Sequence, residues 1–335
     1  MSRPAAPAAT VSAPVGMAIV IGSAALFGML GPLSRFAYDA GMEPPAFVVW
    51  RALVGLAATA AFVAWRVHRG DITLARWSTL PGSARRLLLL AALMGFTLNL
   101  AMFIAFDRIT VALALLGFYT YPAMVALANA ALGRDRLDRR RVVALALALA
   151  GMVAVVASQL DPAAGIRFDA LGFGLALGAA LSQTVFVVVS RDGYPTVPTE
   201  QAMTVVLGVT VVGATAVSLL MGHADSLVEP VRSPSLLPLL LFTGIFAAAI
   251  PSMGFLTGIR AIGGTRAGIL MLFEPVVGVA LAAWLLGESL VPLQAVGALA
   301  ILGAAIILQR GSGDAAADPD ALADDGRALV VPGGP

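Results

Sequence analysis

Residues 269–288 read ILMLFEPVVGVALAAWLLGE, a stretch that is apolar over the length of a membrane-spanning helix except for one carboxylate, Glu274. About 20 helical residues, rising about 1.5 Å each, cross a hydrocarbon core about 30 Å thick. A charged side chain near the centre of that core costs at least about 2.5–3.5 kcal/mol. The role of Glu274 therefore depends on whether this stretch crosses a membrane and on what surrounds it there.

The composition of the chain indicates a membrane protein. Across 335 residues, 59% are hydrophobic, only 12% are charged, and the mean hydropathy is +0.93, which is too apolar for a soluble globular protein. Apolar windows of about 20 residues follow one another with short connections. The sequence therefore predicts an all-α polytopic membrane protein with ten transmembrane helices, at 15–34, 44–65, 86–106, 109–132, 141–159, 168–190, 199–222, 234–258, 261–286 and 290–309.

The arginines predict the orientation. All 21 basic residues are arginine; with a cytoplasmic N-terminus, 16 fall in cytoplasmic segments and 4 in outer ones, and Arg51 lies inside a helix. Since basic residues favour the cytoplasmic side, both termini are predicted to be cytoplasmic. Exclusive use of arginine, with abundant Ala and Gly, is typical of a GC-rich bacterial genome. The expected location is the bacterial inner membrane, with membrane lipid around the helices.

The two halves of the chain repeat one another. A shift of 153 residues, without a gap, places Pro45 on Pro198, Pro122 on Pro275, Asp135 on Glu288 and Leu137 on Leu290. The segment LLGFYTYPAMVALANAALGRD thereby matches GILMLFEPVVGVALAAWLLGE in the spacing from proline to terminal acid. Such internal symmetry at this scale is a sign of a repeat architecture.

Each predicted repeat has five helices, an odd number, so the second repeat enters the membrane from the opposite side. Two inverted repeats of this kind permit alternating access by rocking one half against the other. The predicted organisation is a cytoplasmic N-terminal segment at 1–14, a first repeat at 15–159, a second at 160–309 and a disordered cytoplasmic tail at 310–335, where there is little to bury.

The repeated motif resembles a known family. A proline-centred helix, a Gly-acid pair and a small-residue helix occur in both halves, and the chain also has FG in AALFGMLGPLSRF, WRALVG, and ALSQTVFVVVSR. Together they resemble the EamA domain of the drug/metabolite transporter superfamily over nearly the whole membrane portion. The second copy is the closer match, because Arg134 and Asp135 stand where the family has glycine and glutamate.

The resemblance implies a ten-helix, two-repeat carrier of small metabolites in the bacterial inner membrane, often an exporter of amino acids or related solutes. The chain has no Walker-type phosphate loop, which leaves proton coupling or exchange. Two other classes stay open: a membrane-embedded enzyme, which would need clustered ionisable groups, and a non-transporting scaffold. The enzyme is disfavoured because the chain offers one buried acid and no buried His or Cys.

Glu274 has a functional and a structural interpretation. Lying 13 residues past Ala261, about 20 Å along the helix, it is expected near the bilayer centre and facing a cavity or a partner. It could bind a substrate amine or accept a transported proton. Alternatively, a protonated carboxyl could donate to a neighbouring helix carbonyl and hold the repeats together.

Pro122 and Pro275 each remove an amide hydrogen and are expected to bend their helices beside a central cavity. Polar residues at similar depth are costly to expose to lipid and are candidates for the cavity lining, although hydrogen bonding between helices is an equal alternative for each. Three consecutive residues span about 200° of a helix, so Tyr119, Thr120 and Tyr121 cannot all face one cavity. The candidate lining is Asn99, Tyr119, Tyr121, Ser182, Gln183, Ser252 and Phe273; for Phe273, core packing is the commoner role.

The remaining charged positions have structural interpretations. Arg51 lies about six residues inside its helix and is expected to extend outward or to pair with Asp39 or Glu43. Asp135 and Glu288 lie at helix ends, where hydrogen bonding within loops is expected.

The composition also bears on cofactors and partners. The chain has no Cys, and its two histidines, His68 and His223, lie in predicted loops, so neither a metal site nor another cofactor is expected, and no nucleic acid partner. The small-residue helices at 141–159 and 290–309 could pair between subunits in a homodimer or pack within one chain.

Overall fold

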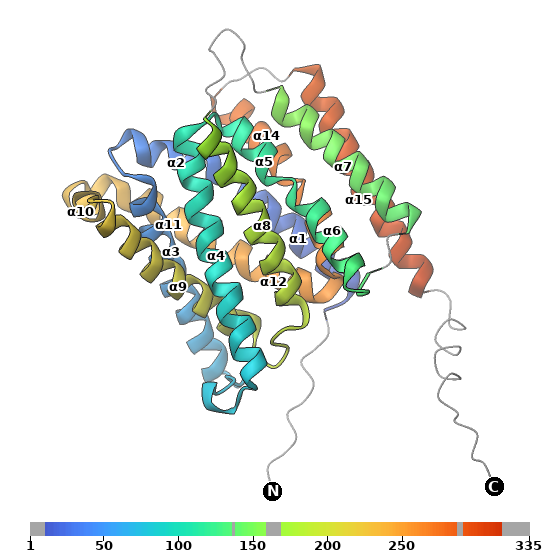
Figure 1. The fold of residues 1–335 in the computed structure, drawn as a ribbon, viewed down its shortest axis with the longest axis horizontal. Helices are drawn as coiled ribbons and strands as arrows, with labels where there is room; N and C mark the ends of the chain where they lie inside the picture. Colours follow the sequence, from blue (N-terminus) through green and yellow to red (C-terminus); the bar gives the residue numbers. More distant parts are fainter. Residues whose placement is uncertain (1–10, 136–137, 159–168, 287–290, 317–335) are drawn as a thin grey trace, which may run out of the picture.

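The computed structural model describes residues 11–135, 138–158, 169–286 and 291–316, and within these residues every regular element is helical (Figure 1). Glu288, most of the predicted N-terminal segment and most of the predicted tail lie outside the described residues. Helices α1 and α15 mark the two ends of the described chain, and α1 begins and α15 ends at the same, lower side of the bundle in Figure 1.

The described residues of the first half form seven α-helices. Several ends have a local cause: Pro44 occupies the first turn of α3, where a missing amide hydrogen costs nothing, and the Asp138 side chain accepts a 2.7 Å hydrogen bond from the Arg141 amide at the start of α7. The helices are α1 (Ala13–Gly28), α2 (Leu30–Asp39), α3 (Pro44–His68), α4 (Gly82–Arg108), α5 (Val111–Phe118), α6 (Tyr121–Ala131) and α7 (Arg139–Ala157), with a short 3₁₀ turn at Trp77–Thr79.

In the second half, the part of the chain that the structure describes forms eight α-helices and one π-helical segment. Asp169 caps α8 by accepting a hydrogen bond from the Gly172 amide, and Gly263, with φ of +83°, ends α12. The elements are α8 (Ala170–Asp192), α9 (Thr199–Leu220), α10 (Ala224–Arg232), a 3₁₀ turn (Pro234–Leu236), α11 (Leu237–Gly244), the π-helical segment (Ile245–Ala249), α12 (Ile250–Ile262), α13 (Gly264–Met271), α14 (Glu274–Leu286) and α15 (Pro292–Ala316).

Within the described residues, seven helical stretches are long and apolar enough to cross a membrane. They correspond to seven of the ten predicted windows, and the all-helical membrane class is thereby confirmed. Of the other three windows, 15–34 and 261–286 each form a pair of shorter helices, and in 290–309 the apolar stretch Pro292–Leu308 of α15 is shorter than the seven. The seven stretches are Pro44–His68, Gly82–Arg108, Val111–Ala131, Arg139–Ala157, Ala170–Asp192, Thr199–Leu220 and Pro234–Ile262.

The packing of the two halves has an internal symmetry. Helices α3 and α9 are repeat equivalents and pack on each other, as do α7 and α15. Helix α1 packs on α12, and their equivalents α8 and α4 also pack together. When the two halves are exchanged, each of the first pairs maps onto itself, and the pair α1 with α12 maps onto the pair α8 with α4. A two-fold relation between two repeats requires this pattern.

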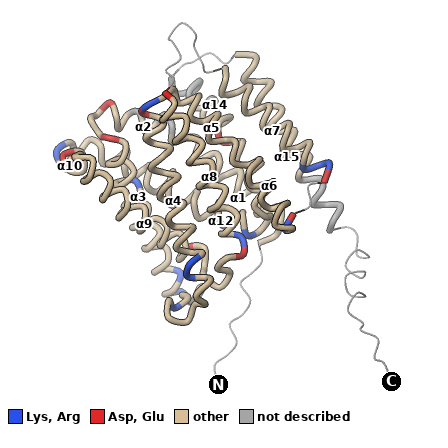
Figure 2. The backbone as a smooth tube through the Cα atoms, viewed as in Figure 1, with Lys and Arg blue, Asp and Glu red and all other residues tan. Residues whose placement is uncertain are grey.

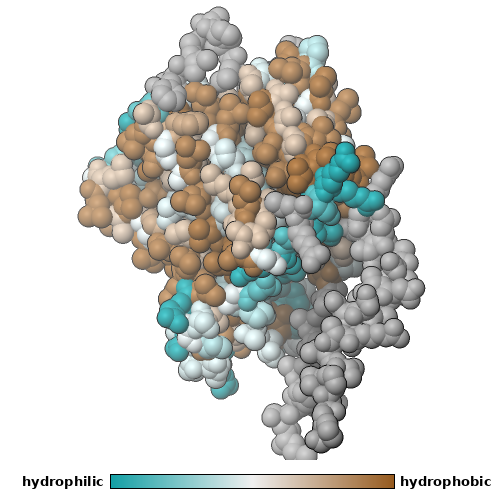
Figure 3. All heavy atoms as spheres, turned by 45° about the vertical axis from the view of Figure 1, so that its right-hand side comes forward, coloured by the Kyte–Doolittle hydropathy of each residue, from teal (hydrophilic) through white to brown (hydrophobic). Residues whose placement is uncertain are grey.

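Charge and hydropathy change along the direction in which the long helices run. Charged residues gather toward its two ends and leave the middle largely uncharged (Figure 2). One face carries a broad apolar band, with hydrophilic residues gathered below it (Figure 3). Large apolar side chains point outward from many helices, for example Val212 at 71% exposure and Leu299 at 68%. An apolar belt between two polar ends is what a bilayer selects.

Helices α7 and α15 pack along each other at one side of the bundle (Figure 1). Their contact depends on glycine: a Cβ on Gly297 would lie 2.5 Å from the Gly151 carbonyl oxygen. The small-residue helices at 141–159 and 290–309 thus pack within one chain, which was one of the two predicted alternatives.

Candidate functional site

A cavity of about 100 Å³ lies between the two halves. That volume holds several water molecules or a small solute, since one water needs roughly 10–15 Å³ on this measure. Five side chains with polar groups line it, and together they come from α3, α4, α8, α9 and α12. They are Arg51, Asn99, Gln183, Thr210 and Ser252.

The cavity is related to the repeat. Asn99 and Ser252 are equivalent under the shift of 153 residues, and so are Gly95 and Ala248; all four line the cavity. The helices that contribute lining residues, with Phe27 on α1 included, form three equivalent pairs: α1 with α8, α3 with α9, and α4 with α12. The cavity therefore lies at the interface between the two pseudo-symmetric halves. Transporters built from inverted repeats hold their substrate at this interface.

The rest of the cavity wall is apolar. Phe186 and Phe255 contribute aromatic rings from α8 and α12, and Phe27 faces them from α1; the aliphatic part includes Leu98 and Met203. Small-molecule sites commonly combine such walls with a few polar groups that fix orientation.

Among the described residues that line the cavity, Arg51 is the one that carries a charge, and only 4% of it is exposed. Its Nη1 donates to the Ala247 carbonyl oxygen at 3.0 Å, and its Nη2 donates to Asn99 Oδ1. The guanidinium carbon lies 5.2 Å from the centre of the Phe103 ring. Its Nε has no hydrogen-bond partner, and within the described part of the chain no carboxylate lies within 4 Å of the guanidinium.

The sequence-based expectation for Arg51 was wrong. The side chain neither extends outward nor pairs with Asp39 or Glu43, and the Glu43 carboxylate lies 3.5 Å from His223 instead. The reason is tertiary: Asn99, whose Nδ2 donates to the Gly95 carbonyl oxygen at 2.7 Å, presents its Oδ1 to the guanidinium. The sequence did contain a signal for this site, because an arginine inside a predicted membrane span usually faces the protein interior or a cavity and has a function there.

The π-helical segment gives Arg51 its second acceptor. A π-turn widens a helix by one residue, and such turns occur frequently at functional sites. Ala247 lies inside this segment, and its carbonyl oxygen accepts from Arg51. The segment can approach α3 because both surfaces are small: a Cβ on Gly55 would lie 3.2 Å from the Cβ of Ala248.

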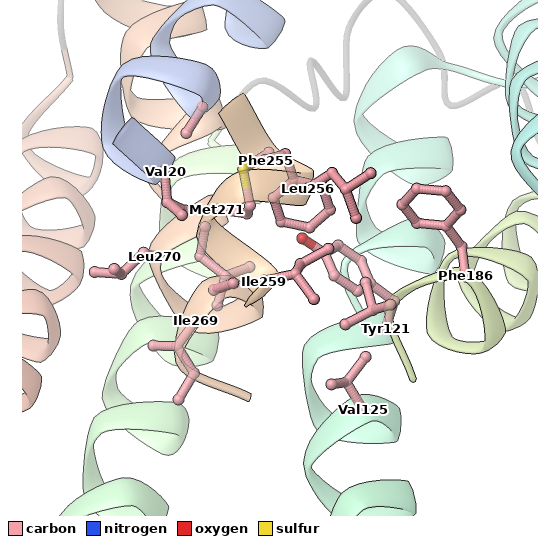
Figure 4. Packing of buried hydrophobic residues seen from close by; sticks show 14 of the residues in the cluster. Val20, Tyr121, Val125, Phe186, Phe255, Leu256, Ile259, Ile269, Leu270 and Met271 are labelled. Carbon is pink, nitrogen blue, oxygen red and sulfur yellow. The ribbon is translucent and has the colours of Figure 1, made fainter. Parts of the chain in front are cut away.

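Three of the predicted lining residues, Asn99, Gln183 and Ser252, line this cavity. Tyr119 and Tyr121 do not, and belong to the hydrophobic core at 1% exposure each. Tyr121 projects from α6 toward Leu256 and Ile259 of α12 (Figure 4). The other two residues also lie elsewhere: Phe273 packs against the core, and Ser182 is buried outside the lining.

Glu274 lies apart from this cavity lining, in a second polar group with the two tyrosines. It is the first residue of α14 rather than a mid-helix residue, because α13 ends at Met271. A helix N-terminus favours a carboxylate. Glu274 is partly exposed and close enough to the phenols of Tyr119 and Tyr121 to interact with them electrostatically, although the Tyr119 hydroxyl is outside hydrogen-bonding geometry.

Both predicted proline positions interrupt their helices. Pro122 is the second residue of α6 and Pro275 the second residue of α14, each following a two-residue turn after the preceding helix. The breaks are complete rather than bends, since a proline in the first turn starts a new helix without loss of a hydrogen bond. Neither proline belongs to the lining of the described cavity.

Asp135 joins the two halves at one end of the bundle. Its carboxylate accepts a hydrogen bond from the Thr265 hydroxyl at 2.8 Å and lies 3.2 Å from Arg191 Nη1. Hydrogen bonding within loops was expected for this helix-end acid; its partners lie instead in helices α13 and α8 of the second half of the chain. Within the described residues, no group of three or more His, Cys, Asp or Glu side chains could hold a metal ion.

These features define a helical, multi-pass membrane protein with a partly polar cavity between two packed halves. The model of the EamA-like transporter family matches the chain twice, over residues 14–157 and 170–310. The chain therefore belongs to the EamA-like transporter family, which is a family of transporters rather than of enzymes. The predicted family membership is confirmed.

The comparison with solved structures agrees with this fold. Twenty-eight chains match, and one of them, described only as "Crystal structure of protein", is 20% identical over 88% of this chain and 97% of its own length, with a TM-score of 0.67. At this identity the likeness concerns the fold alone. The search of curated proteins found no match.

Proposed function

We propose that this protein is a secondary transporter that moves small metabolites across a bacterial inner membrane, by efflux of amino acids or related solutes. The observation that carries the proposal is the cavity lined by three equivalent helix pairs. Rocking one half against the other would open such a cavity to either side in turn. Family membership and the symmetric packing of the halves support the same function.

The proposal includes ten membrane crossings in two inverted five-helix repeats, with both termini cytoplasmic. The excess of arginine on the proposed cytoplasmic side supports this orientation. The broken helices α5–α6 and α13–α14 would each count as one crossing, as in other carriers whose helices are interrupted near mid-depth. In this proposal Glu274 carries a coupling proton or meets a substrate amine, and Pro122 and Pro275 set the helix breaks around it.

Counterflow with purified protein in proteoliposomes tests the function. Vesicles loaded with unlabelled amino acids and related organic acids should accumulate the labelled solute transiently, whereas protein-free vesicles should not. Ser252→Phe, which fills the cavity, should abolish the exchange, and Val212→Phe on the exposed face should leave it intact. A scaffold or an enzyme would give no saturable exchange with either variant or with the unmodified chain.

A further inference from the structure

We propose that the Arg51 guanidinium is the binding site for a carboxylate group of the transported solute, so that the protein selects monocarboxylates. This inference rests on the proposed transport function and assigns the substrate class of the same cavity. It starts from an imbalance: Arg51 is buried at 4% exposure, lines the cavity, and has a positive charge that no carboxylate of the described residues neutralises by direct contact.

The hydrogen-bonding capacity of Arg51 is partly unused. A guanidinium has five N–H donors. Ala247 and Asn99 each accept one hydrogen bond, and Nε has no partner. A buried donor without a partner is costly, and a carboxylate binds a guanidinium through two parallel N–H···O bonds. One carboxylate would therefore satisfy the free Nε and one further N–H together.

A purely structural role for Arg51 does not account for the charge. Holding the Ala247 carbonyl of the π-helical segment needs only a neutral donor, whereas burying a cation has a much larger desolvation cost. The carbonyl, the Asn99 amide oxygen and the Phe103 ring offset part of that cost. They also fix the guanidinium in one orientation beside the cavity, as a binding group requires.

The rest of the lining limits the solute to one negative charge. Among the described lining residues there is no second cation, so a dianion such as phosphate would be left half neutralised. The same part of the lining contains no acid, which disfavours amines that lack a carboxylate. Gln183 and Ser252 make no side-chain hydrogen bond in the described structure and could meet polar groups of the solute, while Phe186 and Phe255 would pack against its apolar part.

The experiment compares matched solutes in counterflow with purified protein. The panel holds aliphatic and aromatic amino acids, the corresponding deaminated organic acids, their methyl esters and their decarboxylated amines. The expected result is exchange of solutes with a free carboxylate and little or none of the esters and amines. Equal exchange of acids, esters and amines would overturn the site assignment and leave the transport function standing.

Two variants test the residue itself. Arg51→Gln removes the charge, and Asn99→Asp places a resident carboxylate beside Arg51 with almost no change in shape. Both should raise the KM for carboxylate solutes about tenfold or more, the effect of losing one charge-assisted hydrogen bond. Arg51→Lys should keep the preference for acids at a higher KM. A structural Arg51 predicts instead that Asn99→Asp leaves the preference and the KM unchanged, which would refute the inference.

Folding and function are controlled separately. Arg260, a second arginine inside the bundle, donates to the Val197 carbonyl oxygen at 2.9 Å and lies outside the cavity lining, so Arg260→Lys measures the general cost of altering an inward-facing arginine. If the unmodified chain exchanges no solute of the panel, the proposed transport function fails for amino acids and the related organic acids. The carboxylate site is then tested by thermal denaturation in detergent. Carboxylates should raise the melting temperature of the unmodified chain and not that of Arg51→Gln, and an equal rise for both would refute the carboxylate site.

Discussion

Gly151 on α7 and Gly297 on α15 approach so closely that a Cβ atom on Gly151 would lie 2.6 Å from the Gly297 carbonyl oxygen. In a membrane, where lipid is as apolar as leucine, close backbone packing of this kind is a main source of helix association. The pairing of α7 with α15 therefore depends on the absence of two side chains.

Gly151→Ala should destabilise the protein, because the new methyl group meets backbone that cannot rotate away. We expect a cost of about 1–3 kcal/mol, as for other overpacked sites. Thermal denaturation in detergent measures it. Gly178→Ala is the matched control, since a Cβ there has open space around it and should cost little. Equal melting temperatures for the two variants would contradict the described contact.

Asp135 and Arg191 should be energetically coupled. Their contact at 3.2 Å lies on partly buried side chains, and Asp135 also accepts from Thr265, so the network should be worth more than an exposed ion pair, about 1 kcal/mol or somewhat above. A double-mutant cycle with Asp135→Asn and Arg191→Gln gives the coupling from the melting curves. Strictly additive effects would show that the two residues act independently.

The contact between Asp169 and Arg108 should make stability depend on pH. Arg108, which donates a hydrogen bond to Asp169, holds the pKa of that carboxyl below its usual range. Because the folded-state pKa is depressed, the contact stabilises the fold above the unfolded pKa of about 3.9 and is lost as the pH falls through the folded value.

The melting temperature of the unmodified chain should accordingly exceed that of Asp169→Asn near neutral pH, and the difference should close as the pH is lowered below about 4. Arg108→Gln should give the same pattern. A difference that stays constant down to pH 3 would exclude the ion pair as its source.

Glu274→Gln should separate coupling from binding if Glu274 carries the coupling proton. A neutral side chain at this position cannot exchange a proton, so accumulation driven by an imposed pH gradient should be lost while counterflow persists. Glu200→Gln is the control, because Glu200, in the first turn of α9, forms an ion pair with Arg66 and has no proposed role in coupling. Unchanged gradient-driven uptake by Glu274→Gln would remove Glu274 from the coupling mechanism.

Much of the fold was predictable because its determinants are local. Ten apolar windows, the 153-residue repeat and the paired prolines at Pro122 and Pro275 are properties of short segments. They indicated helices, although the two prolines mark complete breaks where bends were expected. The lining residues were only partly predictable. Asn99, Gln183 and Ser252 face the cavity whereas Tyr119 and Tyr121 enter the core, because polarity alone does not say which side of a packed helix faces the cavity.

The sequence by itself determined the membrane class, the two-fold repeat and the family of this protein, because hydropathy, spacing and motif are written along the chain. Tertiary structure decided the environment of Arg51. Its hydrogen-bond acceptors, Asn99 and Ala247, lie 48 and 196 residues away along the chain. The Ala247 carbonyl also belongs to a π-helical segment, which the hydrophobic periodicity of the sequence did not predict. Whether a charge inside a helix extends to the surface or lines a cavity is decided by the packing of distant helices around it.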